Sequence, residues 1–209
     1  MRQLGETDRQ TVWLEEAMHR AANLRQLVTN IDRMLARGGV DAEDRSRTAR
    51  RAAELLRTYE ALGRNSYGPC PCTPVIATIV GGLVEMFGHT VGSVVLLMEL
   101  QPLELAPERR RALVLAASEL VINALRHAFV GRRSGIIRLD LHCDPRQRKA
   151  SMCIADNGVG PAGFGEGSGL GCHIIRGLAE VLDGAVVWRH SESLGGTEAL
   201  LSFPLAASG

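Results

Sequence analysis

The sequence of 209 residues is informative first for what it lacks. It has no apolar run near the roughly 20 residues that cross a bilayer. Its first ten residues, MRQLGETDRQ, lack the apolar core of a signal peptide. These absences predict a cytoplasmic protein with no membrane span. A basic excess is also missing, because 24 Lys and Arg stand against 23 Asp and Glu, and this argues against a general nucleic-acid binder.

Cysteine is scarce, and its spacing argues against two common kinds of site. Five cysteines stand at positions 70, 72, 143, 153 and 172. Cys70 and Cys72 have a single residue between them, whereas zinc knuckles and thioredoxin-like sites have two. We therefore expect reduced thiols. The composition is otherwise that of a folded protein, with 45% hydrophobic and 22% charged residues.

Glycine and proline are absent from residues 9–62, except for Gly38 and Gly39. On each side of that pair, apolar residues recur at steps of three and four, over residues 14–35 and 48–62. This spacing predicts two helices that form an antiparallel hairpin. Nothing in the segment covers the apolar stripe of the hairpin, so we expect a dimer in which two hairpins form a four-helix bundle.

Residues 64–74 are typical of a linker, and the pattern after them changes to mixed helix and strand. We expect helices over residues 76–88, 107–129 and 172–182. Strands are expected over residues 91–100, 136–142, 150–155, 186–190 and 198–203. The chain is thus predicted to have two domains, a helical hairpin in residues 1–66 and an α/β domain in residues 67–209.

One polar pattern lies on the predicted helix 107–129. Glu119, Asn123, Arg126 and His127 follow one another at spacings of four, three and one, so they share one face of an otherwise apolar helix. Taken alone, this face is typical of a solvated helix surface.

Two glycine-containing segments follow. Asp156 leaves a predicted strand directly before Gly158 and Gly160, which leaves its carboxylate over an open backbone. The run GSGLG at residues 167–171 precedes a helix, where backbone N–H groups and the helix N-terminus favour phosphate. This run is neither a Walker A loop nor a Rossmann fingerprint, because the residues that complete those motifs are missing.

In order and spacing, these segments resemble a known superfamily. ELVINALRHA (119–128), ADNGVG (155–160) and GSGLGCHIIRGLAEVLDG (167–184) are similar to the N, G1 and G2 boxes of the GHKL ATPases, which include DNA gyrase and the histidine kinases. Gly195-Gly196-Thr197 also matches. The form of the boxes resembles sensor histidine kinases of the HisKA_2 and HWE types. The resemblance implies a Bergerat-type α/β sandwich for the second domain.

The resemblance also implies ATP and magnesium as cofactors. Asn123 would hold the magnesium ion and Glu119 would orient a metal-bound water. Asp156 would accept a hydrogen bond from the adenine amino group, with support from Thr197. The remaining residues that the resemblance assigns to the pocket and the phosphates are Arg126, His127, Gly158, Gly160, Gly167, Gly169, Leu170 and Gly171.

The first predicted helix contains His19 in the segment EAMHRAANLRQ, which is similar to the H box of the same kinases. With Leu14 at heptad position a and Ala17 at d, His19 falls at f, the position farthest from the seam. An exposed imidazole there is able to attack a phosphoryl group. The resemblance therefore implies that His19 is the phosphoacceptor. The segment departs from the family at Ala22, where a lysine is usual.

We therefore expect a dimeric histidine kinase core that phosphorylates His19 from Mg-ATP and passes the phosphoryl group to an aspartate of a response-regulator receiver domain. One alternative is a histidine phosphotransferase of the same architecture that does not use ATP. The presence of Asn123, Asp156 and GSGLG argues against it. The short segment 161–166 keeps it open, as does the expectation that the ten or so residues before the first predicted helix are too few for a sensor domain. A second alternative is an anti-sigma-factor-like serine kinase, and a third is a scaffold. We expect Trp13 and Trp188 to be packing residues.

Overall fold

The structure is a computed structural model that describes residues 46, 50, 53, 57, 58, 70–91, 93–160 and 170–205. From residue 70 onward it contains the helices α3 (Thr73–Val91), α4 (Pro107–His127) and α5 (Leu170–Val181). The strands are β1 (Cys70–Pro71), β2 (Ser93–Leu100), β3 (Glu104–Leu105), β4 (Ser134–Asp144), β5 (Lys149–Asp156), β6 (Ala185–His190) and β7 (Thr197–Pro204). The predicted hairpin, including His19, lies outside the described residues except for five isolated positions.

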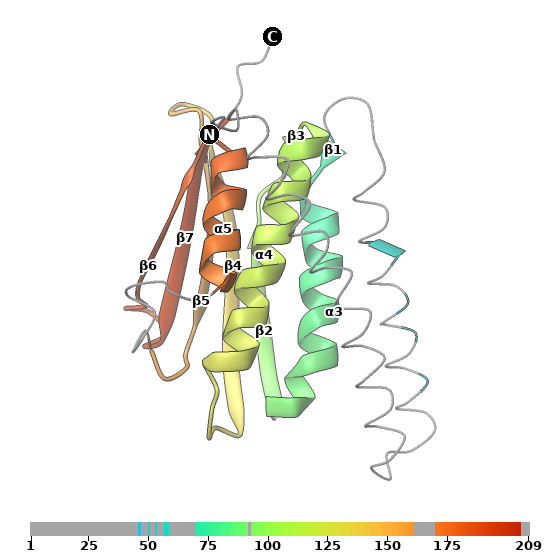
Figure 1. Ribbon diagram of the computed structural model, residues 1–209, viewed down its shortest axis with the longest axis vertical. Helices are drawn as coiled ribbons and strands as arrows, with labels where there is room; N and C mark the ends of the chain where they lie inside the picture. The colour runs from blue at the N-terminus through green and yellow to red at the C-terminus, as the bar shows by residue number, and fades with distance from the viewer. Residues whose placement is uncertain are drawn as a thin grey trace, which may run out of the picture.

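Five strands form one mixed sheet in the order β2-β4-β5-β7-β6. β2 pairs with β4 in parallel, and all other neighbours in this sheet are antiparallel. Two parallel strands need a crossover connection, and here α4 provides it between β2 and β4. The helices α5, α4 and α3 lie side by side over one face of the sheet (Figure 1). The short strands β1 and β3 pair separately beside α4.

Helix α4 is the central element of the helical layer. Pro107 stands in its first turn, where the missing N–H costs nothing. Its last turn carries Arg126 and His127, basic residues that suit the negative end of the helix dipole. Most of its middle is buried, because α3, α5 and the sheet surround it. No helix of the described residues is long and apolar enough to span a membrane.

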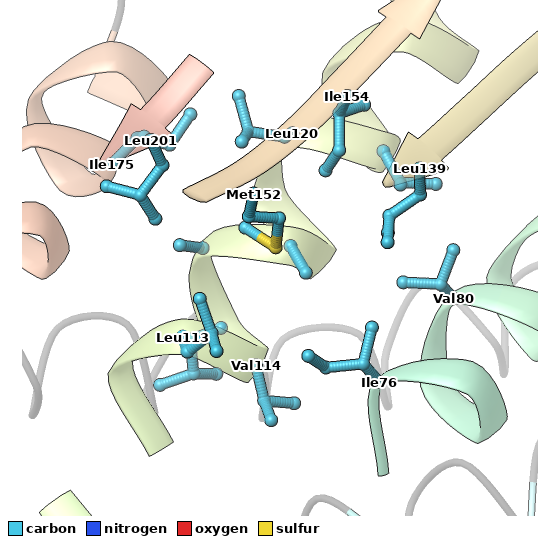
Figure 2. Close-up of a cluster of buried hydrophobic side chains, with 14 of the residues drawn as sticks. Ile76, Val80, Leu113, Val114, Leu120, Leu139, Met152, Ile154, Ile175 and Leu201 are labelled. Carbon is cyan, nitrogen blue, oxygen red and sulfur yellow. The ribbon is translucent and has the colours of Figure 1, made fainter. Parts of the chain in front are cut away.

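The hydrophobic core lies between the helical layer and the sheet. Figure 2 shows Met152 of β5 near the centre of a cluster of apolar side chains. Met152 is fully buried, and its flexible thioether fills the space between α4 and the strands. The other labelled side chains come from all three helices and from three strands: Ile76, Val80, Leu113, Val114, Leu120, Ile175, Leu139, Ile154 and Leu201.

The opposite face of the sheet is polar over its centre. Arg138 of β4 forms an ion pair with Asp140, with 2.9 Å between Nε and Oδ2, and its Nη2 atom donates to the Ser193 hydroxyl. At the neighbouring strands, Arg189 of β6 pairs with Glu198 of β7, with 2.7 Å between Nε and Oε1. The three helices of residues 70–205 all lie on the other side of the sheet (Figure 1).

In residues 70–205, the five predicted strands are all present, and each of the three helices predicted there is present with shifted ends. Helix α3 runs from Thr73 to Val91, so the predictions that it ends at Gly88 and that Val91 begins a strand were wrong. The predicted linker also ends earlier, because Cys70 and Pro71 pair with β3 and the Cys72 N–H donates to the Leu103 carbonyl. The packing of α3 on α4 outweighs local helix-breaking signals, since tertiary burial supplies most helix stability.

The five cysteines are free thiols, as predicted. Cys72 is fully buried, and this burial raises the pKa of its thiol to about 12. On the polar face of the sheet, burial raises the pKa of Cys153 to about 11, and the nearby carboxylates of Glu198 and Asp140 act in the same direction. Both thiols are therefore protonated at neutral pH.

Candidate functional site

Asp156 is the last residue of β5, and its carboxylate is buried with only 5% of the residue exposed. Its Oδ1 atom accepts hydrogen bonds from the Gly158 N–H at 2.8 Å and from the Thr197 N–H at 3.2 Å. Both hydrogen bonds that the Asp156 carboxylate accepts from described residues are made to this one oxygen. As far as the described residues are concerned, the second oxygen, Oδ2, is available as an acceptor for a ligand.

The loop before β7 must carry glycine next to this carboxylate. A Cβ atom on Gly196 would lie 2.3 Å from Asp156 Oδ1 and 2.5 Å from the Gly158 nitrogen. No side chain fits at that distance. The Gly195-Gly196-Thr197 segment is therefore shaped so that the Thr197 N–H reaches a residue 41 positions earlier in the chain.

Two opposing effects set the protonation of Asp156. Burial raises the pKa of its carboxyl above the usual 3.8, and this is the largest effect. The hydrogen bonds from Gly158 and Thr197 and the charge of Arg132 act in the opposite direction, without cancelling it. The carboxylate thus sits where an unpaired charge is costly, and a ligand that donates a hydrogen bond to Oδ2 would offset part of that cost.

The turn after Asp156 is held tightly against the end of α4. The Val159 N–H donates to the Ala128 carbonyl at 2.9 Å, and a Cβ atom on Gly158 would lie 2.3 Å from that same carbonyl oxygen. Gly160 has φ +82°, a conformation that favours glycine. On the far side of the turn, Arg132 donates to the Asn157 carbonyl. Gly158 and Gly160 therefore shape the backbone of the site.

Asn123 of α4 faces the first turn of α5. A Cβ atom on Gly171 would lie 3.3 Å from both the Oδ1 and Nδ2 atoms of Asn123, so Gly171 allows the close approach of the two helices. The first turn of α5, which begins at Leu170, therefore lies beside this amide. Backbone N–H groups and the helix dipole at such an end favour an anion.

A pocket joins these features. It contains three residues predicted for the site, Asn123, Asp156 and Thr197. Its walls are otherwise apolar. Trp188 of β6 is among them, and it also packs against the hydrophobic core, as predicted. The remaining lining residues are Leu120, Ala124, Ala128, Ile154 and Ala199. A buried acceptor between apolar walls suits a flat heteroaromatic ring with an amino group.

The other predicted site residues occupy different positions. Glu119 is half-buried on α4, one turn before Asn123, whereas Arg126 and His127 are exposed at the end of that helix; none of the three lines the pocket. Gly167, Gly169 and His19 lie outside the described residues, and of Leu170 only the backbone is described.

A metal ion at this site would depend on few protein ligands. Among the described residues there is no group of three or more His, Cys, Asp or Glu side chains that would hold a metal. Asn123 offers one amide oxygen at the pocket. This suits Mg²⁺, which commonly takes one or two protein ligands and completes its shell with water and with phosphate oxygens of a substrate.

Comparisons with known proteins identify the family to which this fold belongs. A family model described as the histidine kinase-like ATPase domain matches residues 90–198, which is more than half of the chain. The chain is 27% identical over 205 residues to the sensor histidine kinase PdtaS of Mycobacterium tuberculosis. This alignment covers 94% of the chain but only 40% of that relative.

Solved structures show the same fold. The histidine kinase domain of a blue-light activated histidine kinase from Erythrobacter litoralis EL346 matches with a TM-score of 0.63 at 20% identity, covering 96% of this chain and 94% of that one. The Acinetobacter baumannii histidine kinase AdeS matches with a TM-score of 0.50 at 16% identity, covering 90% and 98%. These likenesses confirm the predicted α/β sheet fold of the second domain.

Proposed function

Because this chain belongs to the family of histidine kinase-like ATPase domains, we propose that it is a histidine kinase core that phosphorylates its own His19 from Mg-ATP. The phosphoryl group then passes to an aspartate in the receiver domain of a response regulator. One observation carries the proposal: the buried Asp156 carboxylate is held on one oxygen and offers the other to a pocket that also contains Asn123.

Asp156 recognises the base. Its Oδ2 atom accepts a hydrogen bond from the amino group of adenine, while Gly158 and Thr197 hold Oδ1 in place. Leu120 and Ile154 provide apolar surface on which the ring packs. Guanine carries a carbonyl at the corresponding position, and two acceptors facing each other would be left unpaired. The site therefore favours adenine over guanine.

Asn123, Glu119 and the start of α5 serve the phosphates. A bound magnesium ion would neutralise phosphate charge, and the Asn123 amide oxygen would be its protein ligand. Glu119 lies one turn earlier on the same helix and would orient a water molecule beside the ion. Gly167, Gly169 and Gly171 would allow backbone N–H groups to approach phosphate oxygens, and Arg126 or His127 would lie near the phosphates.

His19 is the nucleophile in this scheme. A lone pair on an imidazole nitrogen forms a bond to the γ-phosphorus, while the bond from that phosphorus to the bridging oxygen breaks and ADP leaves. A carboxylate oxygen of the receiver aspartate then attacks the phosphohistidine and frees the imidazole. The hairpin of residues 1–66 presents His19 and pairs two subunits as a dimer, which we place in the cytoplasm.

Incubation with γ-labelled ATP and magnesium tests the proposal. We expect label that is lost in acid, because phosphohistidine is acid-labile whereas phosphoserine is stable. His19→Ala is expected to abolish labelling without changing ATP affinity. Asn123→Ala is expected to abolish labelling from ATP and still accept phosphate back from a phosphorylated regulator, since His19 is intact.

Two outcomes would replace the proposal with its alternatives. Exchange of phosphate with a regulator, but no labelling from ATP, would indicate a phosphotransferase. Acid-stable label on a partner protein, with His19→Ala as active as wild type, would indicate a serine kinase.

Mixing His19→Ala with Asn123→Ala tests the geometry of transfer. Label that appears in this mixture would show transfer between the subunits of a dimer.

A further inference from the structure

Trp188 is the one aromatic side chain among the described residues that line the pocket. It lies on β6, an edge strand of the sheet, and pairs in register with Ala199 of β7. Ala199 in turn pairs with Ile154 of β5. These three residues form a continuous row across three strands, and all three line the pocket, so the row forms its floor.

The floor row lies next to Asp156 and Thr197 on the same face of the sheet, two residues away along each strand. On β5, Ile154 is two positions before Asp156, and on β7, Ala199 is two positions after Thr197; alternate residues of a strand share a face. The smallest side chain of the row, Ala199, stands between Ile154 and Trp188. The indole is therefore the bulky group that closes the floor on the β6 side.

Arg176 of α5 holds the indole in this position. Its guanidinium carbon lies 5.4 Å from the centroid of the Trp188 ring, within the range of a cation–π contact. The contact joins α5, whose first turn faces Asn123, to the strand that closes the pocket floor. Rotation of the indole away from the floor would break it.

We propose that Trp188 makes the nucleotide site selective against substituents on the N6 nitrogen of adenine, and that Arg176 is a positioning residue for its ring. The proposal rests on the proposed function, because it takes the ligand to be ATP with its amino group at Asp156. The phosphates then lie toward Asn123 and α5, so a substituent on the N6 nitrogen points away from them, toward the floor row. Trp188 rejects such substituents by occupying that space.

Substituted nucleotides test this steric role by calorimetry. We expect wild type to bind N6-benzyl-ATP at least about a hundredfold more weakly than ATP, since overfilling a packed site is costly. Trp188→Ala is expected to reduce this ratio at least about tenfold, because removal of the indole opens space for the benzyl ring. Trp188→Phe keeps an aromatic floor and should retain most of the discrimination. Val187→Ala changes the adjacent exposed residue of β6 and is the matched control.

Fluorescence tests the contact without relying on activity. The chain has two tryptophans, so Trp13→Phe leaves Trp188 as the single reporter. We expect ATP to quench or shift its emission with the same midpoint that calorimetry gives. Arg176→Gln is expected to change the emission before ATP is added and to relax discrimination against N6-benzyl-ATP, whereas Arg176→Lys keeps a cation over the ring and restores both.

The outcomes separate this inference from the proposed function. If no variant and no wild-type protein binds ATP, both fail. If ATP binds, but the emission of Trp188 is unchanged and Trp188→Ala keeps the wild-type ratio of affinities, the inference alone is overturned. A Trp188→Ala protein that fails to fold leaves the test to Trp188→Phe and the fluorescence titration, in which a silent Trp188 counts against the inference.

Discussion

The two faces of the five-stranded sheet are built from the same strands but serve different purposes. Under the helices, β4 buries Leu139 and Leu141, while the residues between and after them on the other face are Asp140 and His142. Apolar packing thus occupies one face, and charged pairs lie over the centre of the other. The nucleotide pocket belongs to the apolar face, at the point where β5 ends in a carboxylate, Asp156.

The comparison of two aspartates shows what this placement achieves. Asp140 lies on the polar face, where its side chain is 32% exposed and paired with Arg138. Asp156 lies on the apolar face, is 5% exposed, and receives backbone N–H groups in place of a charged partner. A buried carboxylate with one oxygen available to a ligand distinguishes ligands better than an exposed ion pair does, because an unpaired group is costly there.

The largest expected effect contrasts neighbouring residues of β4. Leu141→Ala empties space in the core and is expected to lower the free energy of unfolding by about 2–5 kcal/mol. His142→Ala changes the adjacent residue on the polar face and is expected to stay within about 0.5 kcal/mol of wild type. Urea denaturation measures both. Equal losses would contradict the division of the sheet into a packed face and a solvated face.

The next effect contrasts the two aspartates in ATP binding. Asp156→Asn is expected to weaken ATP binding by roughly 1.5–3 kcal/mol, since a hydrogen bond to a charged acceptor is lost. The amide oxygen still accepts from Gly158 and Thr197, so the fold persists. Asp140→Asn is the matched control and should leave ATP affinity unchanged in the same calorimetric titration. An unaltered affinity in Asp156→Asn would contradict the assignment of the base site.

A smaller effect is expected with pH. The pKa of Asp156 is raised above 3.8, so acidification neutralises its carboxylate earlier than that of an ordinary aspartate. ATP affinity should therefore begin to fall at a pH above 3.8, and Asp156→Asn should lack this step. The contribution of Asp156 to the folding free energy has the opposite pH dependence to that of ATP affinity. Because the folded pKa is the higher one, the stabilisation is complete below the unfolded pKa and is lost as pH rises through the folded value.

The smallest effect contrasts two thiols. Cys153 is half-buried on the polar face and Cys72 is fully buried, with pKa values raised to about 11 and about 12. Iodoacetamide should modify Cys153 slowly at pH 8. Below pH 11, the rate should rise about tenfold for each unit of increase in pH, because the thiolate is the nucleophile. Cys72 should stay unmodified in the folded protein. Mass spectrometry of the modified peptides distinguishes the two sites, and equal modification would contradict the burial of Cys72.

Local pattern was sufficient to predict the five strands of the main sheet and to single out Asp156 at the end of one of them. Alternation of apolar and polar residues located β4 and β5, and the position of Asp156 after a strand indicated a free carboxylate. Both signals depend on neighbours along the chain. The Thr197 contact and the loop around Gly196 were suggested by resemblance, and the structure shows the hydrogen bond and the close approach that link them to Asp156.

What the sequence did not reveal depends on contacts between distant segments. Helix α3 continues past Gly88 because it packs along α4, and no local signal carries that information. Trp188 was expected to be a packing residue, and its place in the pocket follows from its pairing with Ala199 across β6 and β7. Register between strands is a property of the assembled sheet, so the role of a single aromatic residue is hidden until that register is known.

The strand order has a consequence for how the protein is made. β6 leaves the ribosome before β7, yet β7 lies between β5 and β6 and is the only strand of the described sheet that pairs with β6. When Trp188 is synthesised, its partner strand β7 does not yet exist. The same is true of the Asp156 carboxylate, because its second N–H donor is Thr197 of β7. Helix α4 and strands β2, β4 and β5 are complete well before that point. We thus expect a nascent chain to acquire most of its core while it is still unable to recognise a nucleotide.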